Sequence, residues 1–299
     1  MILYGVGPNP FEGYEMHKTL IENVVVAYLD NADSPDISNP IHSTEVATAY
    51  GFAGPLVGGV TVWGWATDTI LAALGEDWLG DGWAEYSFRH PTLPGDTLTI
   101  RAVLGAEPPP RAWTIEMINQ SNVVCVVGKV GLGKAVWSDE FIRPQSMHLE
   151  HDSPKKSPLT LETADIGKDW AAMKLDFSKE SAREFTSEKQ LTDNPLFVDN
   201  DAIAHPSWTA GWAEQLLRHN FYIPSSMHTK SRVQHHRKIA LGTSVTGGAH
   251  LIDVYERKAH HFANFDVLLQ DQQGSDIAQL RHWTIFKIAT LEERARIIL

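Results

Sequence analysis

The chain has 299 residues, of which 43% are hydrophobic and 21% are charged, and this suits one large domain or two ordinary ones with a buried core. Its formal net charge is −12, so it lacks the basic field with which a general nucleic-acid-binding protein displaces counterions from phosphates. An anionic small ligand remains compatible with this charge, because such a ligand needs only a local basic patch.

The N-terminal segment has no cationic start followed by a long apolar stretch, so we expect no signal peptide. No run approaches the ~20 apolar residues that a membrane-spanning helix needs. The single cysteine, Cys125, lies in the apolar run NVVCVV, which predicts a buried strand and an inert thiol. One cysteine cannot form an intrachain disulfide, which fits a reducing compartment, and we expect a cytoplasmic protein.

An Asn-Pro turn and an apolar helix are the first predicted elements. The turn is SNPIH, residues 38–42, and the helix is predicted over AGPLVGGVTVWGWATDTILAAL, residues 53–74. Proline and small residues near its beginning suit the first turn of a helix. The stretch YSFRHPTLPGDTLTI, residues 86–100, then predicts two alternating strands separated by a turn at Gly95. The segments AWTIEMIN and SNVVCVVGKVGLG predict two more antiparallel strands.

The second half repeats this order after a polar, proline-containing segment, residues 144–162, that is typical of a linker. DNPLF, residues 193–197, is a second Asn-Pro turn, and AHPSWTAGWAEQLL, residues 204–217, is a second helix opened by Ala-x-Pro. A turn at Gly242 corresponds to the turn at Gly95, and alternating strands follow it.

Each half is therefore predicted as a long helix followed by a meander of antiparallel strands, which is an α+β arrangement with a helix packed on a sheet. The chain is then an internal duplication. The predicted boundaries are residues 1–143 for the first repeat, 144–162 for the linker and 163–299 for the second repeat.

Two further patterns do not predict sites. The sequence GKVGLGKA is similar to the motif of a phosphate-binding loop. However, Ala135 stands where that motif has the Ser or Thr that binds magnesium. The chain has 14 histidines but no H-E-x-x-H motif, and adjacent pairs such as His235 and His236 would face opposite sides of a strand. We expect no metal site.

The first half resembles the MaoC-like hydratases and dehydratases, the (R)-specific enoyl-CoA hydratase family. The family motif has an Asp, one spacer residue, Asn-Pro, an aliphatic residue and His, then a short helix ending in Gly-Phe and a Gly-Pro start to the central helix. The matching residues in this chain are Asn39, Pro40, Ile41, His42, Gly51, Phe52, Gly54 and Pro55. The resemblance implies a double hot-dog fold, in which two antiparallel sheets each wrap around a central helix.

The resemblance also implies a hydro-lyase that adds or removes water at the C2=C3 bond of an acyl thioester such as enoyl-CoA. A histidine and a carboxylate that share one water can activate it at C3 and deliver a proton to C2. Backbone N–H groups at a helix start would stabilise the enolate that develops on the thioester oxygen. The family aspartate should stand at the position of Ile37, and a bulge could bring Asp36 or Asp33 into its place. The catalytic candidates are His42, Asp36 and Asp33.

Further candidates follow from the same resemblance. The expected oxyanion and substrate-binding residues are Asn39, Gly54, Pro55, Gly58, Gly59 and Trp63. The expected contacts to coenzyme A phosphates are Arg89, Arg232, Arg237 and Lys238. A solvated strand edge is the alternative interpretation of this basic run. Coenzyme A would be part of the substrate, and we expect no other cofactor, no nucleic acid and no membrane partner.

The second half has Phe197 where His42 stands in the first half. The resemblance therefore implies a non-catalytic half that shapes a tunnel for a long or bulky acyl group. Four tryptophans on or beside the two predicted helices are expected mainly in the core, with one or two lining the acyl pocket: Trp63, Trp65, Trp208 and Trp212.

Three other functions stay open at this point. The same fold could dehydrate or isomerise a bulky non-thioester intermediate, and the irregular aspartate position favours this alternative. A hot-dog thioesterase would carry a carboxylate on a central helix, and Asp68 and Glu214 are there, although both lie well past the predicted helix starts. A degenerate ligand-binding subunit is the non-enzymatic alternative. A homodimer through an exposed sheet edge is also possible.

Overall fold

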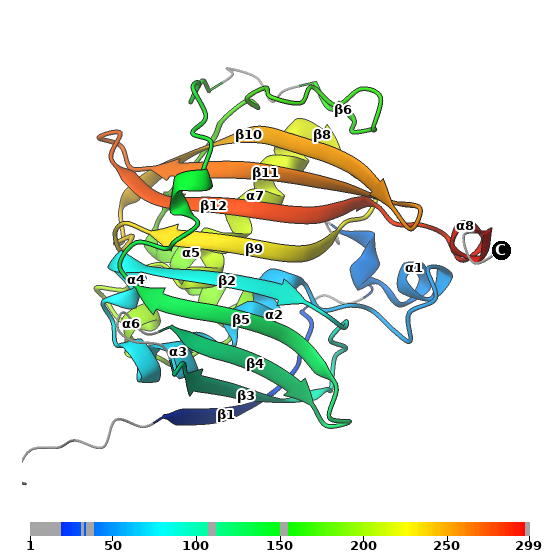
Figure 1. Cartoon of the computed structure of the whole chain (residues 1–299). Helices are drawn as coiled ribbons and strands as arrows, with labels where there is room; N and C mark the ends of the chain where they lie inside the picture. The colour runs from blue at the N-terminus through cyan, green and yellow to red at the C-terminus, as the bar shows by residue number, and fades with distance from the viewer. Residues whose placement is uncertain (1–18, 31–32, 34–38, 107–111, 150–154, 297–299) are drawn as a thin grey trace, which may run out of the picture.

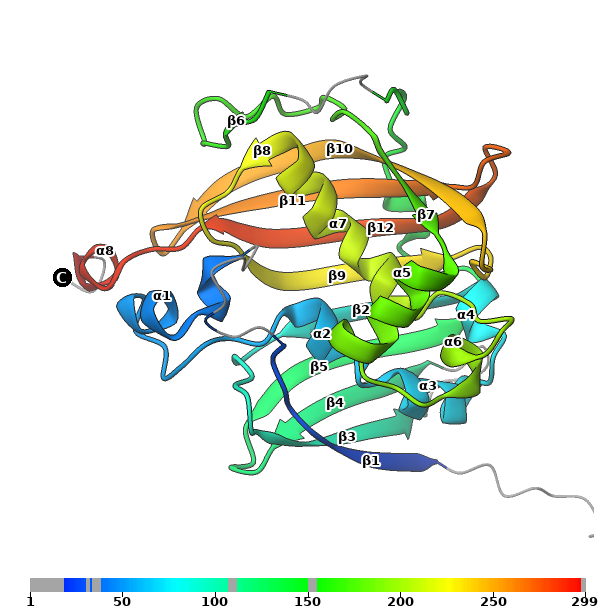
Figure 2. The same cartoon turned by 180° about the vertical axis from the view of Figure 1, so that it is seen from behind.

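The computed structural model describes residues 19–30, 33, 39–106, 112–149 and 155–296. One antiparallel sheet of ten strands dominates this part of the chain, and most of the helices lie on one of its faces (Figures 1 and 2). In spatial order the strands are β1 (Leu20–Val26), β3 (Thr97–Leu104), β4 (Trp113–Asn119), β5 (Val124–Leu132), β2 (Gly82–Phe88), β9 (Met227–His235), β12 (Asp276–Lys287), β11 (His260–Gln270), β10 (Thr243–Arg257) and β7 (Met173–Phe177).

The strand order shows the internal duplication. Reading inward from one edge gives β1-β3-β4-β5-β2, and reading inward from the other edge gives β7-β10-β11-β12-β9. Each half thus has an edge strand, then a meander of three consecutive strands, and innermost a strand that precedes this meander in the sequence. The two five-stranded sheets join where β2 pairs with β9, from Trp83 opposite Gln234 to Ser87 opposite Lys230. The predicted double hot-dog, α+β fold is therefore confirmed, with its two sheets continuous through this central pair.

The two predicted glycine turns lie at equivalent places in the two sheets. Gly95 precedes β3 with φ of 89°, and Gly242 precedes β10 with φ of 83°. This left-handed backbone strongly favours glycine. The segment GKVGLGKA contributes to β5 and leads out of it, so it is a strand and not a phosphate-binding loop.

The helices of the first half are shorter than the sequence pattern suggests. They are a 3-10 turn (Pro40–His42), α1 (Thr44–Ala49), α2 (Gly59–Gly64), α3 (Thr67–Leu74) and α4 (Trp78–Asp81).

The prediction of one helix over residues 53–74 is wrong in two respects. Leu56 and Val57 donate their N–H groups to the carbonyls of Ile41 and Thr92, which holds the preceding segment outside a helix. The central helix therefore begins only at Gly59, and it is interrupted between α2 and α3.

The second half keeps its central helix whole. Its helices are α5 (Lys179–Glu184), which continues into a π-helical turn (Phe185–Lys189), α6 (Pro195–Val198), α7 (Pro206–Asn220) and α8 (Leu291–Arg296). Pro206 occupies the first turn of α7, as its Ala-x-Pro start predicts. Helix α7 crosses the second sheet, and α2 lies beside its N-terminal part (Figure 2).

Three short elements lie outside the large sheet and the central helices. A 3-10 turn (Ser138–Glu140) follows β5, and β6 (Ser157–Pro158), within the predicted linker, pairs with β8 (Phe221–Tyr222). The strands of the predicted first repeat, β1 to β5, lie in one half of the large sheet, and β7 and β9 to β12 of the second repeat lie in the other half.

The outer strands β1 and β7 form the edges of the large sheet. Strand β1 exposes three apolar side chains, Leu20, Val24 and Val26. The homodimer stays a prediction. Among the residues described, no helix combines the length and the apolar character needed to cross a membrane.

The central helix of the second half rests on a glycine of the sheet. Trp212 of α7 is fully buried, and a Cβ atom added to Gly247 of β10 would lie 2.5 Å from a carbon of its ring. Gly211, one residue before Trp212, has no atom within 3.4 Å of such a Cβ atom. The two glycines therefore differ in how much room they leave.

We expect Gly247→Ala to lower the free energy of unfolding by about 1–3 kcal/mol, because the new methyl group must displace a packed indole ring. Urea unfolding followed by tryptophan fluorescence measures this change. Gly211→Ala is the matched control, and we expect it to raise stability by up to about 1 kcal/mol, because alanine favours the helix interior. Equal unfolding midpoints for Gly247→Ala and the wild type would contradict this packing.

Candidate active site

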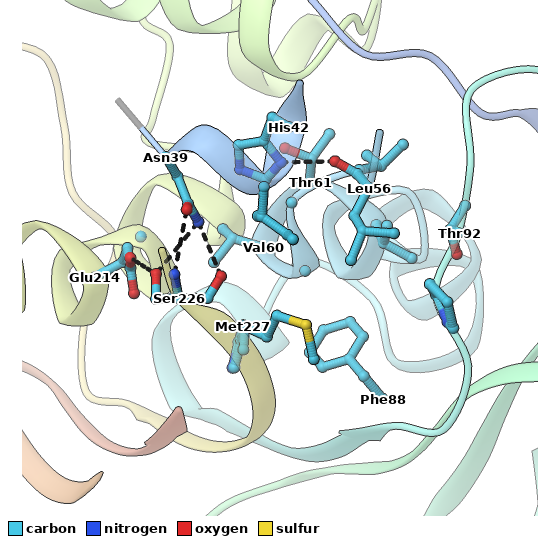
Figure 3. A pocket seen from close by; sticks show the side chains of 18 of the residues that line it. Asn39, His42, Leu56, Val60, Thr61, Phe88, Thr92, Glu214, Ser226 and Met227 are labelled. Carbon is cyan, nitrogen blue, oxygen red and sulfur yellow. Dashed lines mark hydrogen bonds between the residues drawn. The ribbon is translucent and has the colours of Figure 1, made fainter. Parts of the chain in front are cut away.

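A cavity of about 440 Å³ lies between the two halves, and both contribute to its wall (Figure 3). The first half supplies the Asn-Pro turn, the segment leading into α2, and residues 88–92 after β2. The second half supplies one face of α7, the start of β9 and His282 of β12. The wall is mostly apolar, with a small number of polar groups at defined positions, as is usual for small-molecule sites.

The Asn-Pro turn positions His42. Pro40 begins the 3-10 turn, the side chain of Ser43 caps α1, and the buried Ile41 anchors the turn against Leu56. Nδ1 of His42 lies 2.6 Å from the carbonyl oxygen of Leu56. A carbonyl can only accept, so Nδ1 carries the hydrogen, and Nε2 of the neutral ring has a free lone pair. His42 is therefore held in the tautomer of a general base.

Burial lowers the pKa of His42 below its ordinary value of 6.5. The hydrogen bond to Leu56 and the negative charge of Glu214 oppose this shift, and the positive charge of Arg218 adds to it. The net direction is downward, so the ring is mainly neutral at pH 7. Neutrality at this pH is what a base that must accept a proton requires.

Gly58 lies beside this ring, and both Gly58 and Gly59 line the cavity. Their role as substrate-binding positions stays a prediction. A Cβ atom added to Gly58 would lie 3.5 Å from Cε1 of His42, so the backbone passes close to the ring. Gly54, Pro55 and Trp63 do not line the cavity. Gly54 and Pro55 precede the extended segment described above, and Trp63 is buried in the core, stacked on Tyr86 at 4.1 Å. The prediction that these three contact the substrate is therefore not supported by their positions.

Asn39 lines the cavity, but its amide already has protein partners. Nδ2 donates to the carbonyl and to the hydroxyl of Ser226, and Oδ1 accepts from the N–H group of Ser226 at 3.2 Å. These contacts join the motif of the first half to the segment before β9 in the second half. Asn39 thus connects the halves at the cavity wall.

The predicted aspartates differ in what can be said of them. Asp33 is exposed, and its carboxylate accepts hydrogen bonds from the N–H group and the hydroxyl of Thr44, at 2.6 and 2.8 Å. Those two bonds lower the pKa of Asp33, and they engage it with the first turn of α1. It is not among the residues that line the cavity. Asp36 lies outside the described residues.

Glu214 was a candidate from the sequence only for the thioesterase alternative. Its place two turns into α7 suggested that it lies far from the reaction, yet it lines the same cavity as His42. A periodic signal was available, because Ser207, Gly211 and Glu214 recur at helical spacing on one face and all line the cavity. Figure 3 shows Glu214 and His42 on elements of different halves, with Asn39 drawn between them.

The four predicted phosphate contacts separate in the structure. Arg89 is exposed and lines the cavity. The others lie elsewhere in ion pairs: Arg232 with Glu85 and Glu140, Arg237 with Asp271, and Lys238 with Glu76. None of these three lines the cavity, so their positions do not support the prediction of phosphate contacts. The alternative of a strand edge is wrong for Arg232, because β9 pairs on both sides.

A pair of histidines missed by sequence reasoning lies deeper in the wall. His228 Nε2 is 2.6 Å from the hydroxyl of Ser231, and that hydroxyl is 3.1 Å from Nδ1 of His282. Burial lowers the pKa of His228 far below its ordinary value and that of His282 to about 4. Both rings are therefore neutral at pH 7, and they contact each other at a tilt of 32°, with their centroids 4.1 Å apart.

The equivalent turn of the second half carries no such chemistry. Phe197 is buried where His42 stands in the first half, and its ring packs on His205 at 4.6 Å. Asn194 caps α6 and donates to Asp68 of the first half at 2.7 Å. Among the predicted tryptophans only Trp208 lines the cavity, whereas Trp63, Trp65 and Trp212 are core residues. In the described part of the chain, no three potential metal ligands come together.

Comparison with known proteins supports the fold. No family model matches the sequence, and no curated protein matches it. Among solved structures, a MaoC-like dehydratase aligns with a TM-score of 0.56 at 14% identity, over 83% of this chain and 89% of its own. A protein from Chloroflexus aurantiacus, titled as a MaoC domain dehydratase, aligns with a TM-score of 0.61 at 10% identity, over 95% and 100%.

A conserved hypothetical protein from Mycobacterium tuberculosis with a double hotdog fold aligns with a TM-score of 0.53 at 13% identity, over 83% and 86%. Identities this low speak for shared architecture and leave activity to be argued from the site. The chain therefore has the double hot-dog fold, with the architecture of the MaoC-like dehydratases.

Proposed function

We propose that this protein is a hydro-lyase of the MaoC type, which adds or removes water at the C2=C3 bond of an acyl thioester. The observation that carries the proposal is His42, whose Nδ1 is fixed by the Leu56 carbonyl and whose Nε2 has no hydrogen-bond partner among the described residues of a mostly apolar cavity. The neutral ring can accept a proton from water and return it to carbon.

The step balances with the groups in this cavity. Nε2 of His42 takes a proton from water as the water oxygen bonds to C3, and the C2=C3 electron pair moves toward the thioester oxygen. The imidazolium then gives its proton to C2, and the carbonyl re-forms. Dehydration is the reverse of this sequence.

The developing negative charge needs fixed donors. The first N–H groups of a helix have no acceptor within the helix, and in α2 these belong to Gly59, Val60 and Thr61. All three residues line the cavity near His42. Backbone N–H groups of this turn would stabilise the enolate, and glycine permits close approach of the thioester.

Coenzyme A is the expected carrier of the acyl group, with Arg89 at the cavity as the contact to its phosphates. The side chains from α7 and β9 extend the wall beyond the reacting carbons, with Trp208 and Met227 among them. This arrangement favours a long or bulky acyl group. No further cofactor is part of the proposal.

The direct test is turnover of purified protein with crotonyl-CoA and with longer and branched enoyl-CoAs, followed by loss of the enoyl absorbance. Mass spectrometry of the product should show addition of one water. If no thioester is turned over, the proposed reaction is wrong, and a bulky non-thioester substrate or a ligand-binding subunit becomes the better explanation.

Thioester hydrolysis is a second candidate, and the position of Glu214 favours it. A carboxylate on a central helix can activate water for attack on the thioester carbonyl. The two reactions give different products, because hydrolysis releases a free thiol and hydration does not. A thiol reagent in the same assay therefore separates them.

A further inference from the structure

Glu214 is the one carboxylate among the described residues that line the cavity. It comes from α7, in the half of the chain that has Phe197 in place of a catalytic histidine. Asp33, by contrast, is exposed and engaged with Thr44. The carboxylate found in this cavity is thus outside the motif that supplies His42.

One oxygen of Glu214 is firmly held. Oε1 accepts a hydrogen bond from Nε of Arg218 at 2.8 Å and a second, short one from the hydroxyl of Ser226. Arg218 is fixed in turn, because it also donates to the carbonyl of Ile223 at 3.0 Å and to the hydroxyl of Ser226 at 2.8 Å. These bonds orient the carboxylate and balance its charge.

The second oxygen is not used in the same way. No hydrogen bond from the described residues reaches Oε2 of Glu214, and the Glu214 side chain is 27% exposed. A carboxylate with one anchored oxygen and one open oxygen can accept a hydrogen bond from water at a defined place.

Hydrogen bonds connect the Asn-Pro motif of the first half to this carboxylate. Asn39 donates to the hydroxyl of Ser226, and the same hydroxyl donates to Glu214 (Figure 3). His42 is close enough for the charge of Glu214 to oppose the lowering of its pKa. One hydrogen-bonded chain thus joins the motif of the first half to the carboxylate of the second.

We propose that Glu214 is the catalytic carboxylate that shares the reacting water with His42, so that the active site is a composite of the two halves. This inference rests on the proposed hydro-lyase function. Oε2 accepts one hydrogen of the water while Nε2 of His42 removes the other, and the oxygen bonds to C3. The carboxylate stays ionised and stabilises the imidazolium until its proton passes to C2. Asn39 and Ser226 act as positioning residues.

The test compares Glu214→Gln with Asp36→Asn in the enoyl-CoA assay. We expect Glu214→Gln to lower kcat by about 10²–10³-fold with little change in KM. The amide keeps the shape of the side chain, but it has no negative charge and only one acceptor oxygen in place of two. Asp68→Asn is the matched control, since Asp68 is an acid on the central helix of the first half and does not line the cavity. It should keep wild-type turnover.

A second measurement does not depend on activity. NMR titration of histidine-labelled protein gives the pKa of His42, identified by the signal missing in His42→Ala. Removal of the Glu214 charge should lower this pKa further in Glu214→Gln and leave it unchanged in Asp68→Asn. If the wild type turns over no thioester, the proposed reaction fails, and this titration still decides whether the two side chains act as a pair.

Two results would overturn the inference. One is a Glu214→Gln protein that is folded and retains wild-type turnover, especially if Asp36→Asn abolishes it, which would place the carboxylate in the motif. The other is an unchanged His42 pKa in Glu214→Gln. Near-ultraviolet circular dichroism of both variants shows whether the core is intact.

Discussion

Replacement of His42 by alanine should lower kcat/KM for enoyl-CoA hydration by about 10²–10⁴-fold, the usual contribution of a general acid–base group. The imidazole is both the acceptor of the water proton and the donor to C2, so its loss removes two functions at once. His42→Gln should be similarly inactive, because an amide occupies much of the space but does not accept a proton at neutral pH.

The pH dependence gives a second readout of the same residue. The neutral ring is the active form, and burial lowers its pKa below 6.5. As pH falls, kcat/KM should therefore stay level through 6.5 and decline only as it passes this lowered pKa. A structural role for His42 would not place an acid limb there.

The control for this experiment is His148→Ala. His148 is exposed and does not line the cavity, so this variant should retain wild-type turnover. Full activity of a folded His42→Ala protein would rule out His42 as the base. A stable fold in that variant is expected, because His42 makes one side-chain hydrogen bond to the described part of the chain, the one to the Leu56 carbonyl.

Local patterns predicted the parts of the fold that depend on neighbouring residues. The NPIH turn, the Pro206 start of α7 and the left-handed turn at Gly242 each follow from backbone preferences of residues within a few positions. The duplication was visible because both halves repeat the same order of such signals.

The errors share one physical cause, which is contact between distant segments. The start of α2 is delayed by hydrogen bonds from Leu56 and Val57 to carbonyls on other elements. Arg232 was predicted at a phosphate site because its neighbours are basic, yet its partner Glu85 lies on the adjacent strand β2. Neither these hydrogen bonds nor this ion pair can be predicted from a short window of sequence.

The candidate site shows the same division. His42 and the adjacent glycines follow from one motif, whereas Glu214 reaches the cavity only because the two halves pack with their central helices close together. The helical spacing of Ser207, Gly211 and Glu214 defines a face, but nothing local shows that this face meets the first half. A composite site of this kind needs the tertiary arrangement to be recognised.

Acidification from pH 7 to pH 5 should lower the free energy of unfolding by about 6 kcal/mol, through three buried histidines that are neutral in the folded protein. Burial lowers the pKa to about 3 for His205 and to about 4 for His235 and His282. In the unfolded chain each should titrate near 6.5. Between these values the unfolded chain binds more protons, so the stabilisation is complete above pH 6.5 and is lost as pH falls toward 4.

Each histidine contributes about 2 kcal/mol of this loss by pH 5, because that pH lies 1.5 units below the unfolded pKa. The total is comparable with the whole stability of many domains, about 5–15 kcal/mol. Urea midpoints at several pH values should therefore shift strongly downward over this interval. Carboxylates whose pKa is lowered, such as Asp169 and Asp276, lose their contribution only at lower pH.

His235→Phe isolates one of the three contributions. His235 packs edge-on against Trp78 in the core at 5.4 Å, so a phenyl ring keeps the shape and removes the titration. Between pH 7 and pH 5, the free energy of unfolding of this variant should fall by about 2 kcal/mol less than that of the wild type. If the free energy of unfolding depends on pH equally in the two proteins, His235 is not held neutral by burial. If the wild-type midpoint does not change over this interval, the folded and unfolded states bind the same number of protons, so the buried histidines titrate near their unfolded pKa in the fold, which their apolar surroundings oppose.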